Sequence, residues 1–300
     1  MTNSNLQTLL DLAIAGLSLG GIYALLAFAL SLTLATTHVL NIAHGSFMVF
    51  GAALATLLIR ELSVNWVLSV ILVIAGFSIV GVIFEFIVVR PLAGKSQEFV
   101  LNGSILITFG LALAMEALLG FYWVRFVDPT PTFSLTIPLG RIDLFGISIG
   151  SGRMVILFVV TVTILLLHFL LRATMLGKLI RALAENHEGA LILGVNPRMV
   201  SIAIYAISFA LTAASGVLIV TALPLDSYSG ILLTLTALTV VVIGGVGSLP
   251  GALLGGCILG VIEVATAYLL GSIWSPVVSV LAFFLVLLLR PQGLLGTVAR

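Results

Sequence analysis

Residues 66–89 read WVLSVILVIAGFSIVGVIFEFIVV, an uninterrupted apolar run in which Glu85 is the only charged side chain. A helix needs roughly 20 residues to cross a hydrocarbon layer of about 30 Å, so this run is long enough to span a bilayer. In lipid, a helix satisfies its backbone hydrogen bonds within one segment, which an isolated strand cannot do. We therefore expect a membrane-spanning helix here.

The composition of the whole chain agrees with this expectation. Of its 300 residues, 61% are hydrophobic and only 8% are charged, which leaves too few polar side chains to cover a soluble globule of that size. The formal net charge is +1, so nucleic acid is not expected as a partner. We predict an all-α, polytopic transmembrane bundle that forms one domain over residues 1–300 in the lipid bilayer.

Nine apolar segments are candidate spans, so the bundle has about eight or nine crossings, some of them broken or re-entrant. Glycines in the segment 229–247 leave open whether it crosses fully or dips in and returns. The segments lie near residues 9–35, 41–59, 66–89, 104–123, 153–171, 199–222, 229–247, 252–270 and 276–289.

The distribution of Lys and Arg favours nine crossings with the N-terminus outside, because cytoplasmic loops carry an excess of these residues. Nine crossings place eight of them inside and four outside, whereas eight crossings divide them six to six. The inside set is Arg90, Lys95, Arg172, Lys178, Arg181, Arg198, Arg290 and Arg300, and the outside set is Arg60, Arg125, Arg141 and Arg153.

Two connections between the spans are long. Residues 124–152 are rich in Pro, Gly, Thr and Ser and are expected to form an extended external loop. Residues 172–198 carry apolar residues at helical spacing and predict an amphipathic cytoplasmic helix over 175–193, which Gly194 and Pro197 end. Such a helix either lies on the lipid headgroups or docks a soluble partner.

Glycine spacing predicts close helix packing and helix breaks. The pairs Gly16–Gly20, Gly251–Gly255 and Gly256–Gly260 have the spacing of small residues that lets helix backbones approach closely. The runs NIAHG at 41–45 and GGVGSLPG at 244–251 place helix-ending residues beside apolar spans. Broken helices of this kind expose free backbone groups in transporters.

A few polar residues within the apolar segments are candidates for a functional role. Asn41 and His44 are three residues apart and share one face if they are helical. At the start of a span, they either bind a substrate carboxylate with the free helix N–H groups or simply cap the helix. Glu116 and Glu263 fall inside spans, where a carboxylate is costly unless it faces protein or water. No cofactor and no metal site is expected from the sequence.

Several runs together resemble the permease subunits of the branched-chain amino acid ABC transporter family. They cover both halves of the chain, and the two most specific are NIAHG and GGVGSLPGA. The matching runs are 21–52, RPLAGKS at 90–96, RALAENHEGALILGVNP at 181–197, VVVIGGVGSLPGALLGG at 240–256 and RPQGLLG at 290–296. Thr36, Thr37 and His38 depart from the family pattern, in which Tyr-Gly and apolar residues are commoner.

The resemblance implies an ATP-driven importer in the bacterial inner membrane. Its expected partners are two ABC ATPase subunits, a second permease subunit that is a paralogue or a second copy, and an external, periplasmic substrate-binding protein. The chain itself is expected not to be an enzyme. The resemblance also implies that 172–198 contains the segment that couples to the ATPase, with the residues Arg181, Glu185, Asn186, Ala190, Gly194, Asn196 and Pro197.

For the substrate pathway we expect Asn41, His44, Gly45 and Ser46, with Gly244, Gly245 and Gly247 opposite them. A pathway with little fixed charge suits a zwitterion with an apolar side chain. Two alternatives stay open: a permease of the same family for amides or urea, and a proton-coupled secondary transporter that uses Glu116 and Glu263.

Overall fold

A computed structural model describes residues 3–136, 141–144, 147–185, 187–290 and 293–295. Helices dominate it, and seven are long and apolar enough to cross a membrane. The long helical segments are α1 (Asn3–Thr37), α3 (Trp66–Phe84) continued by the π-helical turn η1 (Glu85–Val89) and by α4 (Arg90–Leu92), α5 (Gln97–Phe126), α6 (Ser151–Ala173), α9 (Pro197–Ala222), α11 (Leu249–Leu269), and η2 (Ser272–Trp274) with α12 (Ser275–Leu289).

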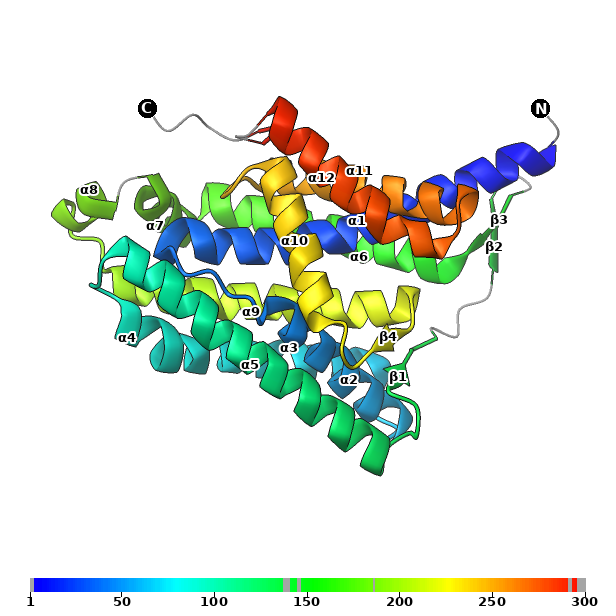
Figure 1. The fold of residues 1–300 in the computed structure, drawn as a ribbon, viewed down its shortest axis with the longest axis horizontal. Helices are drawn as coiled ribbons and strands as arrows, with labels where there is room; N and C mark the ends of the chain where they lie inside the picture. The colour runs from blue at the N-terminus through cyan, green and yellow to red at the C-terminus, as the bar shows by residue number, and fades with distance from the viewer. Residues whose placement is uncertain (1–2, 137–140, 145–146, 186, 291–292, 296–300) are drawn as a thin grey trace.

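Helices α1 and α9 form the centre of the bundle. The most hydrophobic stretch of α1 is 72% buried and that of α9 is 67% buried, whereas the corresponding stretch of α12 is only 6% buried. Helix α1 packs against α11, α9 and α6, while α9 also packs against α3. Figure 1 shows α3 and α5 on one side of this centre and α12 on the other. The exposed apolar helices at the periphery fit lipid or a further membrane subunit.

Two apolar helices are shorter than a full span, α2 (His44–Arg60) and α10 (Gly230–Gly244). Helix α10 lies steeply across the long helices rather than alongside them (Figure 1). The breaks expected at NIAHG and GGVGSLPG are confirmed, because α2 begins at His44, α10 ends at Gly244 and α11 begins at Leu249. Asn41 lies before α2 and is not helical, so it does not share a helix face with His44.

The chain just before α10 and the chain just after it form hydrogen bonds at opposite ends of the bundle. Before α10, the backbone N–H of Ser227 donates to the carbonyl of Pro131 beyond the end of α5. After α10, the N–H of Gly247 donates to the hydroxyl of Ser31 near the end of α1. This path fits a complete crossing, made by a helix too short to count among the full spans.

Small residues let α1 and α11 pack closely, as the glycine spacing predicts. A Cβ added at Gly20 would lie 2.5 Å from the carbonyl oxygen of Gly256, and one added at Gly260 would lie 2.5 Å from the carbonyl oxygen of Gly16. Gly251 likewise meets Gly244 of α10 backbone to backbone. At these positions side chains would force the helices apart, so the glycines set the interhelical distance.

The connection after α5 is more structured than the expected extended loop. The strand β1 (Thr132–Phe133) pairs antiparallel with β4 (Leu225–Asp226), and β2 (Arg141–Leu144) pairs antiparallel with β3 (Ile147–Gly150). Residues 137–140 and 145–146 of this connection lie outside the described residues. Short β-ladders satisfy backbone groups that a Pro- and Gly-rich sequence cannot satisfy as a helix. The composition alone did not indicate them.

The segment 172–198 is helical over most of the predicted range 175–193. It contains α7 (Met175–Glu185) and α8 (His187–Ile192), and Asn186 between them lies outside the described residues. Figure 1 shows α7 and α8 at one end of the bundle, with the N-terminus and β2–β3 at the other.

Candidate functional site

The N-terminal ends of α2 and α10 meet inside the bundle, although they are far apart in the sequence. We define the α2–α10 junction as His44, Gly45, Ser46, Gly230 and Thr234, together with Glu116 of α5. The N–H of Gly45 donates to Thr234 Oγ1 at 2.8 Å, and that hydroxyl donates to the carbonyl of Ile42 at 2.7 Å. A Cβ on Gly230 would lie 2.5 Å from Ser46 Cα, so only glycine permits this approach.

Glu116 supplies the anion at this junction. Its Oε1 accepts the N–H of Ile231 at 2.7 Å and the hydroxyl of Ser46 at 3.3 Å, and its side chain is 7% exposed. A carboxylate is stabilised at a helix N-terminus by the free N–H groups and the helix dipole. A substrate carboxylate at the start of α2 was one of the two alternatives that the sequence left open. In the structure a carboxylate of the chain itself lies beside the starts of both short helices.

His44 and Asn41 are buried beside the junction. His44 Nε2 and Thr212 Oγ1 of α9 are 2.7 Å apart, and the imidazole ring meets Phe209 edge-on at 6.1 Å between ring centroids. His44 Nδ1 and both side-chain polar atoms of Asn41 have no hydrogen-bond partner among the described residues. Buried polar atoms normally have partners, so these atoms are free to bind a ligand or to find new partners when the bundle rearranges.

The second half of the expected pathway lies elsewhere. Gly244 ends α10, which begins at Gly230, and a helix of 15 residues is about 22 Å long. Gly245 and Gly247 follow Gly244 with φ values of +98° and +78°, so they form the turn into α11. The expectation that Gly244, Gly245 and Gly247 face Gly45 is wrong, because the two sets lie at opposite ends of α10. Gly230 and Thr234 face Gly45 instead.

The residues expected for coupling have distinct positions at the α7–α8 end. Arg181 is exposed and donates to the carbonyl of Leu171 at the end of α6. Ala190 is 2% exposed and Gly194, with φ of +79°, ends the turn after α8. Asn196 caps α9 by accepting the N–H of Arg198 at 3.1 Å. Pro197 opens α9, so the end points expected at Gly194 and Pro197 are confirmed.

The tip of this segment exposes large apolar side chains. Leu191 is 46%, Ile192 86% and Leu193 83% exposed, whereas Ile180 and Leu183 of α7 are buried against the bundle. Glu185 is exposed at the end of α7. An exposed apolar cluster with a firmly packed base is typical of a surface that another molecule covers.

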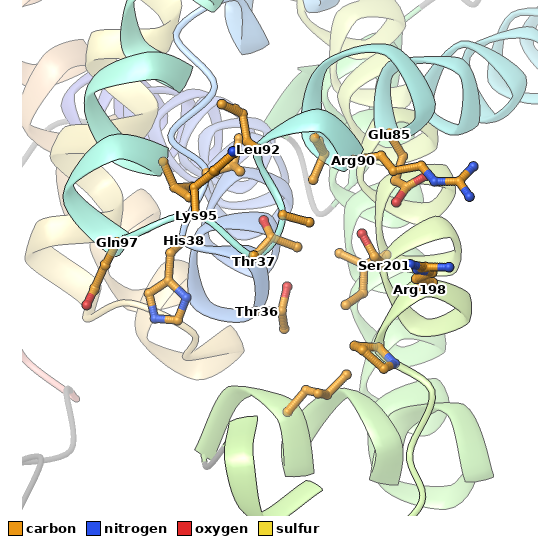
Figure 2. Close-up of a pocket in the computed structure, with 18 residues that line it drawn as sticks. Thr36, Thr37, His38, Glu85, Arg90, Leu92, Lys95, Gln97, Arg198 and Ser201 are labelled. Carbon is orange, nitrogen blue, oxygen red and sulfur yellow. The ribbon is translucent and has the colours of Figure 1, made fainter. Parts of the chain in front are cut away.

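A cavity of about 680 Å³ opens at the same end of the bundle, between the end of α1, η1 with the following turn, and the start of α9. The expected pathway residues do not line it. Figure 2 shows Glu85, Arg90, Arg198 and Ser201 on one side of the cavity, and His38, Lys95 and Gln97 on the other. Thr36, Thr37 and His38, which depart from the family pattern, form part of the cavity wall.

The two carboxylates of the proton-coupled alternative lie in different places. Glu116 belongs to the α2–α10 junction, whereas Glu263 of α11 is half-buried and forms a hydrogen bond with the hydroxyl of Tyr23 in α1. Each carboxylate therefore has partners of its own among the described residues. These partners explain why a carboxylate is tolerated inside a span, and no proton pathway is needed to explain it.

Sequence reasoning missed Gly230, Thr234 and Thr212 as partners of the residues that it selected. Thr212 is one of several hydroxyl side chains in α9. Such hydroxyls usually bond to the preceding turn, as Thr212 also does through the carbonyl of Ser208 at 2.8 Å. Gly230 opens a span directly after the polar run Asp226–Ser229, which reads as an ordinary loop in the sequence. The pairing with α2 depends on how the helices pack.

The described fold, with seven full-length apolar helices and two shorter ones that meet inside the bundle, is that of a multi-pass membrane protein. The model of one family, described as branched-chain amino acid transport system / permease component, matches residues 12–289. The chain belongs to this family.

Curated relatives cover almost the whole chain. The high-affinity branched-chain amino acid transport system permease protein LivH of Salmonella typhimurium is 32% identical over 94% of this chain and 93% of its own length. The protein of the same name in Escherichia coli is 31% identical, and BraD of Pseudomonas aeruginosa, with the same description, is 30% identical, each over 94% of this chain. No solved structure matches the chain.

Proposed function

We propose that this chain is the membrane permease subunit of an ATP-driven importer of branched-chain amino acids in the bacterial inner membrane. The observation that carries the proposal is the family match over residues 12–289, together with relatives named for this transport. The external binding protein delivers the amino acid, two ATPase subunits provide the energy and a second permease subunit completes the pathway. The chain contributes the route through the membrane and performs no covalent chemistry.

The α7–α8 segment is the proposed site of ATPase docking. Support comes from the exposed apolar side chains of Leu191, Ile192 and Leu193 above a buried base. The α7–α8 end also carries Lys178, Arg181 and Arg198, which agrees with a cytoplasmic orientation. An ATPase that moves this segment would act on α9 directly, because Asn196 and Pro197 join the segment to α9.

The α2–α10 junction is the proposed gate of the pathway. In this structure its polar groups are buried, and the starts of the two short helices are held together by Thr234 and Glu116. Separation of the two helix ends would expose helix N–H groups, Asn41 and His44 to a passing solute. Rocking of two helical units around such a point is a common route to alternating access.

Reconstituted transport tests the proposed function. The permease, its ATPases and its second permease subunit are placed in proteoliposomes with ATP enclosed, and tritiated L-leucine is added outside with the external binding protein. We expect accumulation that requires ATP and that the permease alone does not support. Accumulation of leucine by the permease alone would contradict the proposal.

The same assay separates the two alternatives. Competition by unlabelled acetamide or urea at concentrations where valine has no effect would favour a permease for amides or urea. Uptake that follows an imposed proton gradient without ATP, and that is lost in Glu116→Gln or Glu263→Gln, would favour a proton-coupled transporter.

A further inference from the structure

The cavity at the α7–α8 end has the size and lining of a small-molecule site. Its volume of about 680 Å³ is within the range of about 300–1,000 Å³ that ligand pockets have. Exposed polar side chains surround its mouth, including His38, Lys95 and Gln97, and buried apolar side chains lie deeper. The proposed gate does not use this cavity.

Glu85 is an unusual residue in the wall of this cavity. Its side chain is only 3% exposed, and its Oε2 accepts no hydrogen bond within the described residues. A buried carboxylate oxygen without a partner is costly. Arg90 and Arg198 both lie within coulombic range of Glu85, and the Arg90 guanidinium lies over the ring of Phe86, 5.2 Å from the centroid. Glu85 therefore retains an unused position for a cationic donor.

The backbone at Glu85 has an uncommon conformation. The turn Glu85–Val89 is π-helical and interrupts the otherwise regular course from α3 into α4. Single π-helical turns inside α-helices occur frequently at functional sites. Here the turn begins with the one acidic residue of the span and places its carboxylate in the cavity wall (Figure 2).

Helix α9 contributes a hydroxyl and a cation next to Glu85. Arg198 and Ser201 are three residues apart on α9, so they lie on the same face. The cap that Asn196 forms with the N–H of Arg198 fixes the first turn of α9. In Figure 2 the carboxylate of Glu85 points toward Ser201, and Arg198 lies on the same side of the cavity.

An anion, a hydroxyl and a cation that lie close together match the head group of an amino acid. The carboxylate of Glu85 suits the α-ammonium group, and Arg198 with Ser201 suits the α-carboxylate. The buried side chains of Val89, Leu92 and Ile204 in the same cavity suit an aliphatic side chain.

We propose that this cavity is a binding site for a free, zwitterionic aliphatic amino acid at the cytoplasmic end of the pathway, with the head group held between Glu85 and the Arg198–Ser201 face of α9. The assignment of this ligand as the transported solute rests on the proposed function. Leu183 of α7 and Pro197 line the same cavity, so an occupied site contacts the segment proposed for ATPase docking.

Direct binding tests this site. The intact complex of permease and ATPase subunits is placed in nanodiscs without the external binding protein, and equilibrium binding of tritiated L-leucine is measured. In Glu85→Gln we expect binding about 10- to 100-fold weaker, because a hydrogen bond to a charged group is lost. The matched control is Glu98→Gln, an exposed carboxylate in the first turn of α5, which should bind leucine as the unmodified complex does.

A comparison of ligands distinguishes a binding role of Glu85 from a structural one. The probe 4-methyl-2-oxopentanoate has the leucine skeleton and carboxylate but no ammonium group. The unmodified complex should prefer leucine, and Glu85→Gln should remove that preference. A structural defect would weaken both ligands equally and would overturn the proposal, as would leucine binding that Glu85→Gln leaves unchanged.

A second measurement covers the case in which Glu85→Gln does not assemble. Ser201→Cys is introduced together with Cys257→Ala, which removes the single native cysteine, and a membrane-impermeant thiol reagent is applied from the cytoplasmic side. Leucine should slow modification at 201, and 4-methyl-2-oxopentanoate should slow it less. Absence of protection by leucine would overturn the proposal. ATP-driven uptake by the unmodified complex tests the proposed function separately, so the two failures are distinguishable.

Discussion

At the residue scale, Glu116 and the glycines of the α2–α10 junction define how the two short helices meet. Glu116 Oε1 accepts from both Ile231 and Ser46, so one carboxylate oxygen connects the starts of α10 and α2. Gly45 and Gly230 let the two backbones touch. Each feature is local, and single substitutions test it.

Removal of the Glu116 side chain should destabilise the junction. In Glu116→Ala the N–H of Ile231 and the hydroxyl of Ser46 lose their acceptor, and an unsatisfied buried group costs about 1–3 kcal/mol. In Glu116→Gln the side-chain oxygen still accepts both bonds, so the loss should be smaller. The apparent melting temperature of the purified protein in detergent should fall more in Glu116→Ala than in Glu116→Gln. Glu98→Ala is the exposed control. Equal melting temperatures for Glu116→Ala and Glu98→Ala would contradict the bridging role.

A methyl group at Gly45 should separate the two short helices. The added Cβ would lie 2.6 Å from the backbone nitrogen of Thr234, and backbone cannot move aside as a side chain can. We expect Gly45→Ala to lower both the melting temperature and uptake. The control is Gly76→Ala in α3, where a Cβ meets nothing within 4 Å and alanine favours the helix by up to about 1 kcal/mol. A Gly45→Ala protein as stable as Gly76→Ala would show that the contact is unimportant.

At the element scale, α7 and α8 have different positions within the segment 172–198. Helix α7 packs Ile180 and Leu183 into the bundle, while Ile192 at the end of α8 and Leu193 in the following turn are exposed. The left-handed backbone at Gly194 and the cap at Asn196 then redirect the chain into α9. Such an arrangement places an apolar tip at the end of the bundle, which agrees with the docking role proposed for it.

A polar residue at the α8 tip should stop ATPase association without affecting the fold. Ile192→Ser removes an apolar side chain that is 86% exposed and supports no packing. Ile273→Ser is the matched control, because Ile273 is also 86% exposed but lies in η2, away from the tip. Co-purification of the ATPase subunits should be lost only in Ile192→Ser. Retention of the ATPases in both variants would exclude the tip as the docking site.

The redirecting turn after α8 has its own test. Gly194 has φ of +79° with nothing within 4 Å of an added Cβ, so Gly194→Asp introduces backbone strain and a charge without a clash. We expect normal membrane insertion of Gly194→Asp and of Pro197→Leu, with reduced ATPase co-purification. Unchanged transport and ATPase association in both variants would show that the α7–α8 segment is only a surface helix.

At the scale of the whole molecule, the short helix α10 decides how many times the chain crosses. In the part of the chain that the structure describes, seven helices are long enough for full spans, and α2 and α10 are shorter. The chain before α10 is bonded beyond the end of α5, and the chain after it is bonded near the end of α1. Nine crossings follow if these two ends of the bundle face opposite sides of the membrane.

Cysteine labelling checks this topology. In a Cys257→Ala background, Tyr228→Cys and Val246→Cys place exposed thiols just before and just after α10, since these side chains are 56% and 52% exposed. An impermeant thiol reagent should reach residue 228 only from outside and residue 246 only from inside. Labelling of both from the same side would establish eight crossings with a re-entrant α10.

The sequence by itself determined the membrane-spanning class, the positions of the spans and the family. Long apolar runs are helical in lipid whatever surrounds them, so the expected segments agree with the helices within a few residues at most ends. The breaks at NIAHG and GGVGSLPG were also predictable, because glycine and proline act on local backbone conformation. Gly194 and Pro197 ended the cytoplasmic segment for the same local reason.

Only the tertiary structure decided which residues share a site. Gly45 faces Gly230 rather than Gly244 because α10 lies across the bundle, and Glu116 became a bridge because α5 packs beside both short helices. Glu85 and Ser201 are brought to one cavity by the packing of α3 against α9. Periodicity specifies which face of a helix is apolar. Which neighbour covers that face depends on side-chain packing between distant segments, and no single segment contains that information.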